Sequence, residues 1–70
     1  MITKKDKSFG KRIKRLRKKS KLTQEQLADK AGVTSKYIQY IEMAKRYPSF
    51  KLLYRIAKAL GVKVKDLFLF

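Results

Sequence analysis

The sequence predicts an all-α domain, and three observations carry this prediction. Apolar residues recur at the three- and four-residue spacing of helices along most of the chain, and no segment reads as a strand. Two threonines, Thr23 and Thr34, each precede a helical segment, and Gly32 lies between these segments. We expect five helices, at residues 9–19, 24–31, 35–44, 49–60 and 64–68.

The N-terminal part of the chain combines a basic arm with the first helix. Residues 1–8 lack apolar periodicity, and we expect them to form a flexible basic arm before a single domain of residues 9–70. Phe9, Ile13 and Leu16 then recur at i, i+4 and i+7, which is the spacing of one helix face.

The two central helices carry complete start and stop signals. Thr23 is followed three residues later by Gln26, the pattern of a capping box. Gly32 suits the left-handed position just after a helix end. Thr34 then caps the next helix, whose buried side includes Ile38. Two short helices joined by a tight turn that contains glycine form a helix-turn-helix unit.

The two C-terminal helices differ in how clearly the sequence marks their ends. The dipeptide Pro48-Ser49 opens a helix with a wide apolar face, and Gly61 ends it. The segment 64–68 follows as a short helix that is weakly capped, because Lys63 offers no capping oxygen.

Composition limits the possible functions. The 70 residues include 20 Lys+Arg and 5 Asp+Glu, no His and no Cys, for a net charge of +15. Without these residues the usual zinc ligands and catalytic bases or nucleophiles are missing, so we expect no metal, no cofactor and no enzyme. No apolar run approaches the ~20 residues of a membrane span. The charge favours a polyanionic partner, above all nucleic acid, in the cytoplasm.

Two stretches, LTQEQLADKAGVTSKYIQYIE and PSFKLLYRIAKALGVKVKDLF, resemble the lambda-repressor/Cro-like family of helix-turn-helix proteins, also called the XRE family. The resemblance covers about residues 9–68. It implies a compact five-helix domain that places its third helix in the major groove of double-stranded DNA. It also implies a transcriptional regulator of bacterial, archaeal or phage origin, more often a repressor than an activator.

The exposed side of the third helix offers the chemistry of base recognition. At 100° per residue, Ile38 and Ile41 define the buried direction, and Lys36 and Tyr40 lie opposite. Side chains on this face supply donors, acceptors and a ring that suits a thymine methyl group, and Lys36 also suits the acceptors of guanine. The alternative is an ordinary solvated face. With the resemblance, we expect base contacts from Ser35, Lys36, Gln39 and Tyr40.

A second set of residues is expected to contact the DNA backbone. By the resemblance, contacts come from the start of the second helix, from the turn and from the connector after the third helix, at Gln24, Thr34, Lys45 and Arg46. The family often has Asn-Gly-Lys in this connector, whereas this chain has Met43-Ala44-Lys45. Since alanine adopts the left-handed conformation at a cost, we expect the third helix to continue through residue 44. For the other cations of the first helix, two expectations stay open, contact with phosphates and an ordinary solvated face.

One charge pair is expected to be structural. Arg17 lies close to the apolar stripe of the first helix, and Glu42 lies close to the buried direction of the third. Members of the family carry an ion pair at the matching positions. We therefore expect a partly buried Arg17–Glu42 bridge that fixes the third helix against the first.

The chain ends in four consecutive apolar residues, which are more than a short helix can bury. They either pack within the chain or form the seam of a homodimer, and the resemblance favours two-fold dimers. The predicted seam consists of Leu67, Phe68, Leu69 and Phe70.

Three function classes remain open. The first is a sequence-specific regulator such as a repressor or a restriction-modification or phage-type control protein. The second is an antitoxin that also binds its own operator. The third is a cationic protein that binds membranes or RNA through charge alone, for which the paired caps and glycine turn are more structure than needed.

Overall fold

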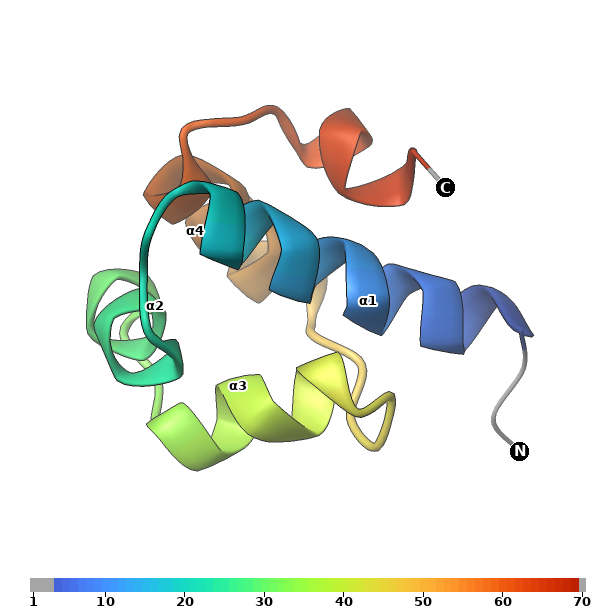
Figure 1. The fold of residues 1–70 in the computed structure, drawn as a ribbon, viewed down its shortest axis with the longest axis horizontal. Coiled ribbons are helices and arrows are strands. Elements are labelled where there is room, and N and C mark those ends of the chain that lie inside the picture. Colours follow the sequence, from blue (N-terminus) through green and yellow to red (C-terminus); the bar gives the residue numbers. More distant parts are fainter. Residues whose placement is uncertain (1–3, 70) are drawn as a thin grey trace.

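The computed structural model describes residues 4–69, which are entirely helices and connections, as the sequence predicts (Figure 1). Residues 4–69 form four α-helices rather than the expected five, because the last segment is a 3-10 helix. The elements are α1 (Lys4–Lys19), α2 (Gln24–Ala31), α3 (Ser35–Glu42), α4 (Phe50–Leu60) and the 3-10 helix η1 (Val64–Phe68).

The first helix begins earlier than expected. It starts at Lys4, so the predicted arm is wrong for residues 4–8, while residues 1–3 lie outside the described part of the chain. Apolar periodicity detects only the buried portion of a helix, which here begins at Phe9. The preceding turn is rich in lysine, a good helix former, and it continues the helix beyond the core.

The caps of α2 and α3 form as predicted. The Oγ1 of Thr23 accepts from the Gln26 N–H at 3.0 Å, and the Gln26 Oε1 accepts from the Thr23 N–H at 2.9 Å. Gly32 adopts the left-handed conformation with φ 75°. The Oγ1 of Thr34 accepts from the Tyr37 N–H at 3.1 Å. These contacts fix both the start of α3 and its angle to α2.

The end of α3 corrects the expected range. The helix stops at Glu42 rather than residue 44, and Ala44 takes the left-handed conformation with φ 61°. The chain then folds back, so that the N–H groups of Lys45 and Arg46 both donate to the Tyr40 carbonyl, at 2.8 and 3.3 Å. These bonds satisfy a carbonyl of the last turn and compensate the strain at Ala44.

The C-terminal elements also differ slightly from expectation. Ser49 lies outside α4 as its cap, and its Oγ accepts from the Leu52 N–H at 3.2 Å. At the start of η1, Lys63 makes no side-chain cap, but the Oδ2 of Asp66 accepts from the Lys63 N–H at 2.9 Å. The Nε of Arg12 donates to the Asp66 carbonyl at 3.0 Å and ties η1 to α1.

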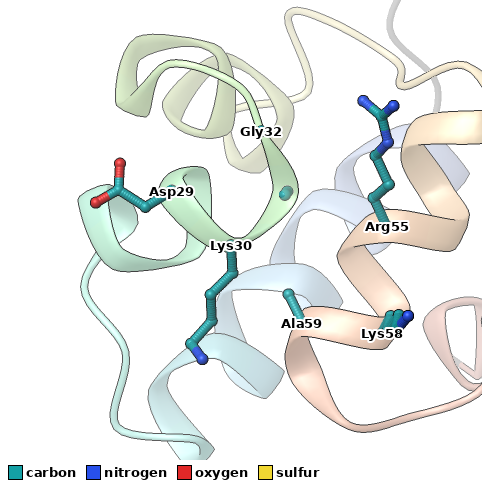
Figure 2. A pocket seen from close by; sticks show the side chains of 7 residues that line it. Asp29, Lys30, Gly32, Arg55, Lys58 and Ala59 are labelled. Carbon is teal, nitrogen blue, oxygen red and sulfur yellow. The ribbon is translucent and has the colours of Figure 1, made fainter.

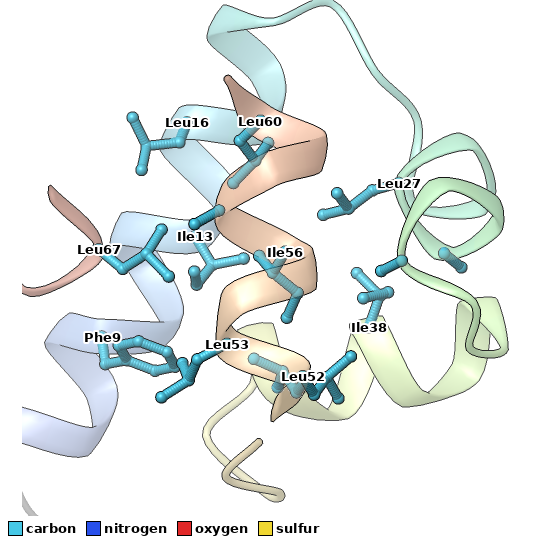
Figure 3. Close-up of a cluster of buried hydrophobic side chains, with 14 residues drawn as sticks. Phe9, Ile13, Leu16, Leu27, Ile38, Leu52, Leu53, Ile56, Leu60 and Leu67 are labelled. Atoms are coloured by element: carbon cyan, nitrogen blue, oxygen red, sulfur yellow. The ribbon is translucent and has the colours of Figure 1, made fainter. Parts of the chain in front are cut away.

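A single core joins all five elements. α4 lies behind α1 in Figure 1, and its buried side chains meet those of α1, α2, α3 and η1 in Figure 3. Ile13, Ile38 and Ile56 are completely buried at the centre of this cluster. None of the helices in residues 4–69 has the length and apolar character required to cross a membrane.

One glycine allows two helices to approach closely. A Cβ atom at Gly10 of α1 would lie 2.6 Å from the carbonyl oxygen of Glu42 and 2.8 Å from that of Ile41. Both distances are far below van der Waals contact, so only glycine fits there without a shift. The backbone of α1 therefore lies directly against the C-terminal end of α3.

Candidate nucleic-acid interface

The outward face of α3 carries the four residues expected to contact bases. Ser35, Lys36 and Gln39 are exposed, and Tyr40 is half-buried. The Nζ of Lys36 lies 5.9 Å from the centre of the Tyr40 ring, within the range of a cation–π interaction. The lysine thus lies beside the ring, and the face offers hydrogen-bond donors, acceptors and aromatic surface within two turns.

The predicted ion pair lies directly behind this face. The Nε of Arg17 contacts the Oε2 of Glu42 at 2.7 Å, and the Nη2 donates to Oε1 at 3.2 Å. The Arg17 and Glu42 side chains are only 10% and 3% exposed, and the Nη1 of Arg17 donates to the Leu22 carbonyl at 2.9 Å. The paired guanidinium therefore holds α1, the following turn and α3 together.

Gln24 joins this network, which the sequence did not predict. Its Nε2 donates to the Oε1 of Glu42 at 3.1 Å. One amide N–H is thus occupied inside the protein, and the carbonyl oxygen and the second N–H remain for another partner. The signal that sequence reasoning lacked was the crossing of α2 over the end of α3, which only the fold defines.

The connector after α3 presents the remaining predicted backbone contacts. Lys45 and Arg46 are exposed, and their bonds to the Tyr40 carbonyl hold them at the end of α3. Arg46 and Thr34, from opposite ends of the helix, line the same hollow as Lys36 and Tyr40. The hollow also includes Tyr37, which the sequence analysis did not select. The signal was its spacing, because Tyr37 lies three residues after Thr34 and three before Tyr40, close to one helix face.

A second basic region lies away from α3, between the end of α2 and α4. This shallow hollow of about 550 Å³ is lined by Asp29, Lys30, Ala31, Gly32, Arg55, Lys58 and Ala59. Figure 2 shows that the side chains of Lys30 and Arg55 point in opposite directions from its rim, and that Asp29 points away from both. The charged groups do not converge on one ligand position, so this region is best described as a solvated rim.

The C-terminal segment divides between core and surface. Leu67 is fully buried, which excludes it from the predicted seam. Phe68 is 38% exposed and stacks on Phe9 with ring centres 5.1 Å apart, and Leu69 is 59% exposed. Phe70 lies outside the described residues.

The helix-turn-helix family model matches residues 13–67, which include α2, α3 and α4 entirely. The chain belongs to this helix-turn-helix family of DNA-binding transcriptional regulators of the XRE, lambda-repressor-like type.

Two relatives illustrate the similarity in sequence. An uncharacterized HTH-type transcriptional regulator of Archaeoglobus fulgidus is 44% identical over 59 residues, which are 84% of this chain and 83% of the relative. The immunity repressor protein of Bacillus phage phi105 is 47% identical over 57 residues, which are 81% of this chain and 40% of the repressor.

Two solved structures are similar in fold. The restriction-modification controller protein C.AhdI from Aeromonas hydrophila has a TM-score of 0.87 and 32% identity, with coverage of 89% of this chain and 94% of the controller. The biofilm regulator SinR, solved in complex with DNA, has a TM-score of 0.79 and 37% identity, with coverage of 84% and 95%.

Proposed function

We propose that this protein is a sequence-specific repressor that reads the major groove of double-stranded DNA with α3. The observation that carries the proposal is the outward face of α3, whose polar and aromatic side chains are backed by the buried Arg17–Glu42 pair. A helix held in this way presents base-reading groups at fixed positions, which specific recognition requires.

The proposal assigns two roles to the residues of the site. Base edges are contacted by Ser35, Lys36, Gln39 and Tyr40, which are gathered on one helix. Phosphates are contacted by residues around the ends of α2 and α3, namely Gln24, Thr34, Lys45 and Arg46. For Gln24 the free N–H is the phosphate donor, because the other N–H is engaged with Glu42. For Thr34 the hydroxyl proton is the donor, because its oxygen already caps α3.

Repression is favoured over activation by the name of one relative. This similar protein, from Bacillus phage phi105, is an immunity repressor. A compact body with a net charge of +15 that occupies a promoter excludes other proteins from the same DNA. Activation would in addition require a contact with polymerase.

A selection from randomised duplexes tests the proposal directly. We expect the purified protein to enrich one half-site and to bind it at least ~10³-fold more tightly than unrelated duplex at the same salt concentration. The Gln39→Ala and Tyr40→Ala variants should relax the enriched motif, whereas Lys58→Ala on α4 should leave it unchanged. If no motif is enriched, or if RNA competes as well as duplex DNA, specific readout by α3 is wrong.

We further propose that the protein acts as a homodimer. The described body measures 28 × 22 × 22 Å, and half-sites of such dimers lie about 34 Å apart, so one copy reaches one half-site. Two exposed apolar surfaces are candidates for the dimer contact. One consists of Phe68 and Leu69 from the predicted seam. The other consists of Phe50 and Tyr54, which lie one turn apart on α4 and are 78% and 59% exposed.

Sedimentation at micromolar concentration tests this association. We expect the wild-type protein to sediment as a dimer and the Leu69→Asp variant as a monomer. A Phe50→Ser/Tyr54→Ser double variant separates the α4 surface from the C-terminal one. A wild-type protein that sediments as a monomer with and without its selected duplex would contradict the dimer.

A further inference from the structure

The hollow on the flank of α3 has a composition that suits one particular base. It encloses about 380 Å³ and is lined by Thr34, Lys36, Tyr37, Tyr40 and Arg46. Tyr37 and Tyr40 are half-buried, so their rings form fixed walls, whereas Lys36 and Arg46 are exposed at the rim. Since this inference names the base that α3 reads, it rests on the proposed function.

The charged groups of the hollow are both cations. Lys36 and Arg46 only donate, and no carboxylate or amide side chain lines the hollow. The oxygen of Thr34 accepts from the Tyr37 N–H at 3.1 Å and is therefore already engaged within the protein. A ligand for this hollow therefore combines hydrogen-bond acceptors with an apolar group that fits against two rings.

The four bases differ in how they meet this requirement in the major groove. Cytosine presents the N4 amino donor, and adenine presents the N6 amino donor beside its N7 acceptor, so both place a donor toward a cationic rim. Guanine presents two acceptors but no apolar group for the rings. Thymine presents the O4 acceptor and the C5 methyl group together.

We propose that this hollow binds the major-groove edge of a thymine. The methyl group packs against the rings of Tyr37 and Tyr40, and O4 accepts a hydrogen bond from the Lys36 ammonium. The 5.9 Å contact between the Lys36 Nζ and the Tyr40 ring keeps the donor beside the apolar wall. Specificity at this position thus depends on a methyl group as well as on a hydrogen bond.

Replacement of thymine by deoxyuridine, which removes only the methyl group, provides the test. In the half-site from the randomised selection, each thymine is replaced in turn and the dissociation constant is measured at fixed salt. We expect one position per half-site at which affinity falls by about fourfold, the factor for ~0.8 kcal/mol of one buried methyl-sized group. If no position responds, or if the half-site requires guanine at the hollow, the inference is wrong.

Variants then connect the methyl effect to this hollow. In Tyr40→Ala the loss on deoxyuridine replacement should disappear at that position, because the wall that holds the methyl group is gone. The control is Lys58→Ala, an exposed residue of α4 outside both the hollow and the proposed dimer surfaces, in which the fourfold loss should persist. An undiminished effect in Tyr40→Ala would overturn the assignment.

A second variant covers the case in which Tyr40→Ala does not fold. Lys36 is exposed, so Lys36→Ala should fold, and it should weaken binding to the thymine and deoxyuridine duplexes equally, since both bases carry O4. A Lys36→Ala variant that binds both duplexes as tightly as wild type would contradict the O4 contact. If the wild-type protein enriches no half-site at all, the proposed function fails, and this outcome is distinct from a specific half-site without methyl dependence.

Discussion

At the scale of single residues, Glu42 connects three elements behind the outward face of α3. It is the last residue of α3, and its carboxylate accepts from Arg17 twice and from Gln24 once while its side chain is only 3% exposed. A buried carboxylate is tolerable only when its oxygens are paired. The single acid that faces the core of the helix-turn-helix unit therefore depends on one arginine from a different helix.

Removal of that arginine should be costly. We expect Arg17→Ala to lower the free energy of unfolding by about 3–5 kcal/mol, because Glu42 then remains buried without its cation. The control is Arg15→Ala, an exposed residue of the same helix, which should change stability by no more than about 0.5 kcal/mol. Urea denaturation followed by circular dichroism measures both, and equal midpoints for the two variants would contradict the structural role.

Ala44 should be a position where glycine stabilises the fold. Its φ of 61° lies in the left-handed region, which costs a residue with a Cβ about 1–2 kcal/mol. Glycine removes that cost but adds about 0.5–1 kcal/mol of freedom to the unfolded chain, so Ala44→Gly should gain about 0.5–1 kcal/mol. Lys58→Gly, inside α4, should instead lose about 1 kcal/mol. A thermal melt of Ala44→Gly below that of wild type would refute this reading of the connector.

At the scale of elements, the sequence predicts what local chemistry determines. The bounds of α2 are correct because Thr23 with Gln26 and Gly32 act within a few residues of the helix ends. The predicted end of α3 is wrong because the connector folds back and donates two hydrogen bonds to the Tyr40 carbonyl. These bonds outweigh the reluctance of Ala44 to adopt the left-handed conformation, and they depend on the path of the chain after the helix.

For the candidate site too, the sequence predicts the residues that local pattern defines and misses those that the fold brings together. Helical periodicity and the resemblance located the exposed residues of α3 and the Arg17–Glu42 pair. They did not locate the Gln24–Glu42 bond or the place of Tyr37 in the hollow, because both depend on how helices cross and how the chain returns after α3.

The packing of α1 against α3 gives a prediction at this scale. Gly10→Ala improves helix propensity by as much as about 1 kcal/mol, yet its Cβ would lie 2.6 Å from the Glu42 carbonyl oxygen. Because backbone atoms cannot move aside without shifting a helix, we expect a net loss of about 1–3 kcal/mol. Lys11→Ala, at the next and exposed position, serves as the control and should be nearly neutral. A Gly10→Ala protein as stable as wild type would show that α1 and α3 are not so close.

At the scale of the whole molecule, charge determines how DNA binding responds to salt. Each phosphate contact by a cation contributes about −0.9 to the slope of log K against log salt on duplex DNA. We expect Lys45→Ala and Arg46→Ala each to make the slope less steep by ~0.9, and Lys58→Ala on α4 to leave it unchanged. Titrations at several salt concentrations measure the slopes, and identical slopes for all three variants would remove the connector from the interface.

Because two acidic groups are already partnered within the fold, the stability of the free protein should depend on salt. Glu42 is buried against Arg17, and the Asp66 carboxylate is engaged with the backbone at the start of η1, so two of the five acids in a chain with 20 basic residues are already partnered within the fold. The solvent-facing shell is therefore close to a single sign of charge and repels itself. Added salt should raise the melting temperature of the free protein while it weakens the complex, so the two quantities move in opposite directions, and the DNA polyanion acts as the natural counterion of the folded state.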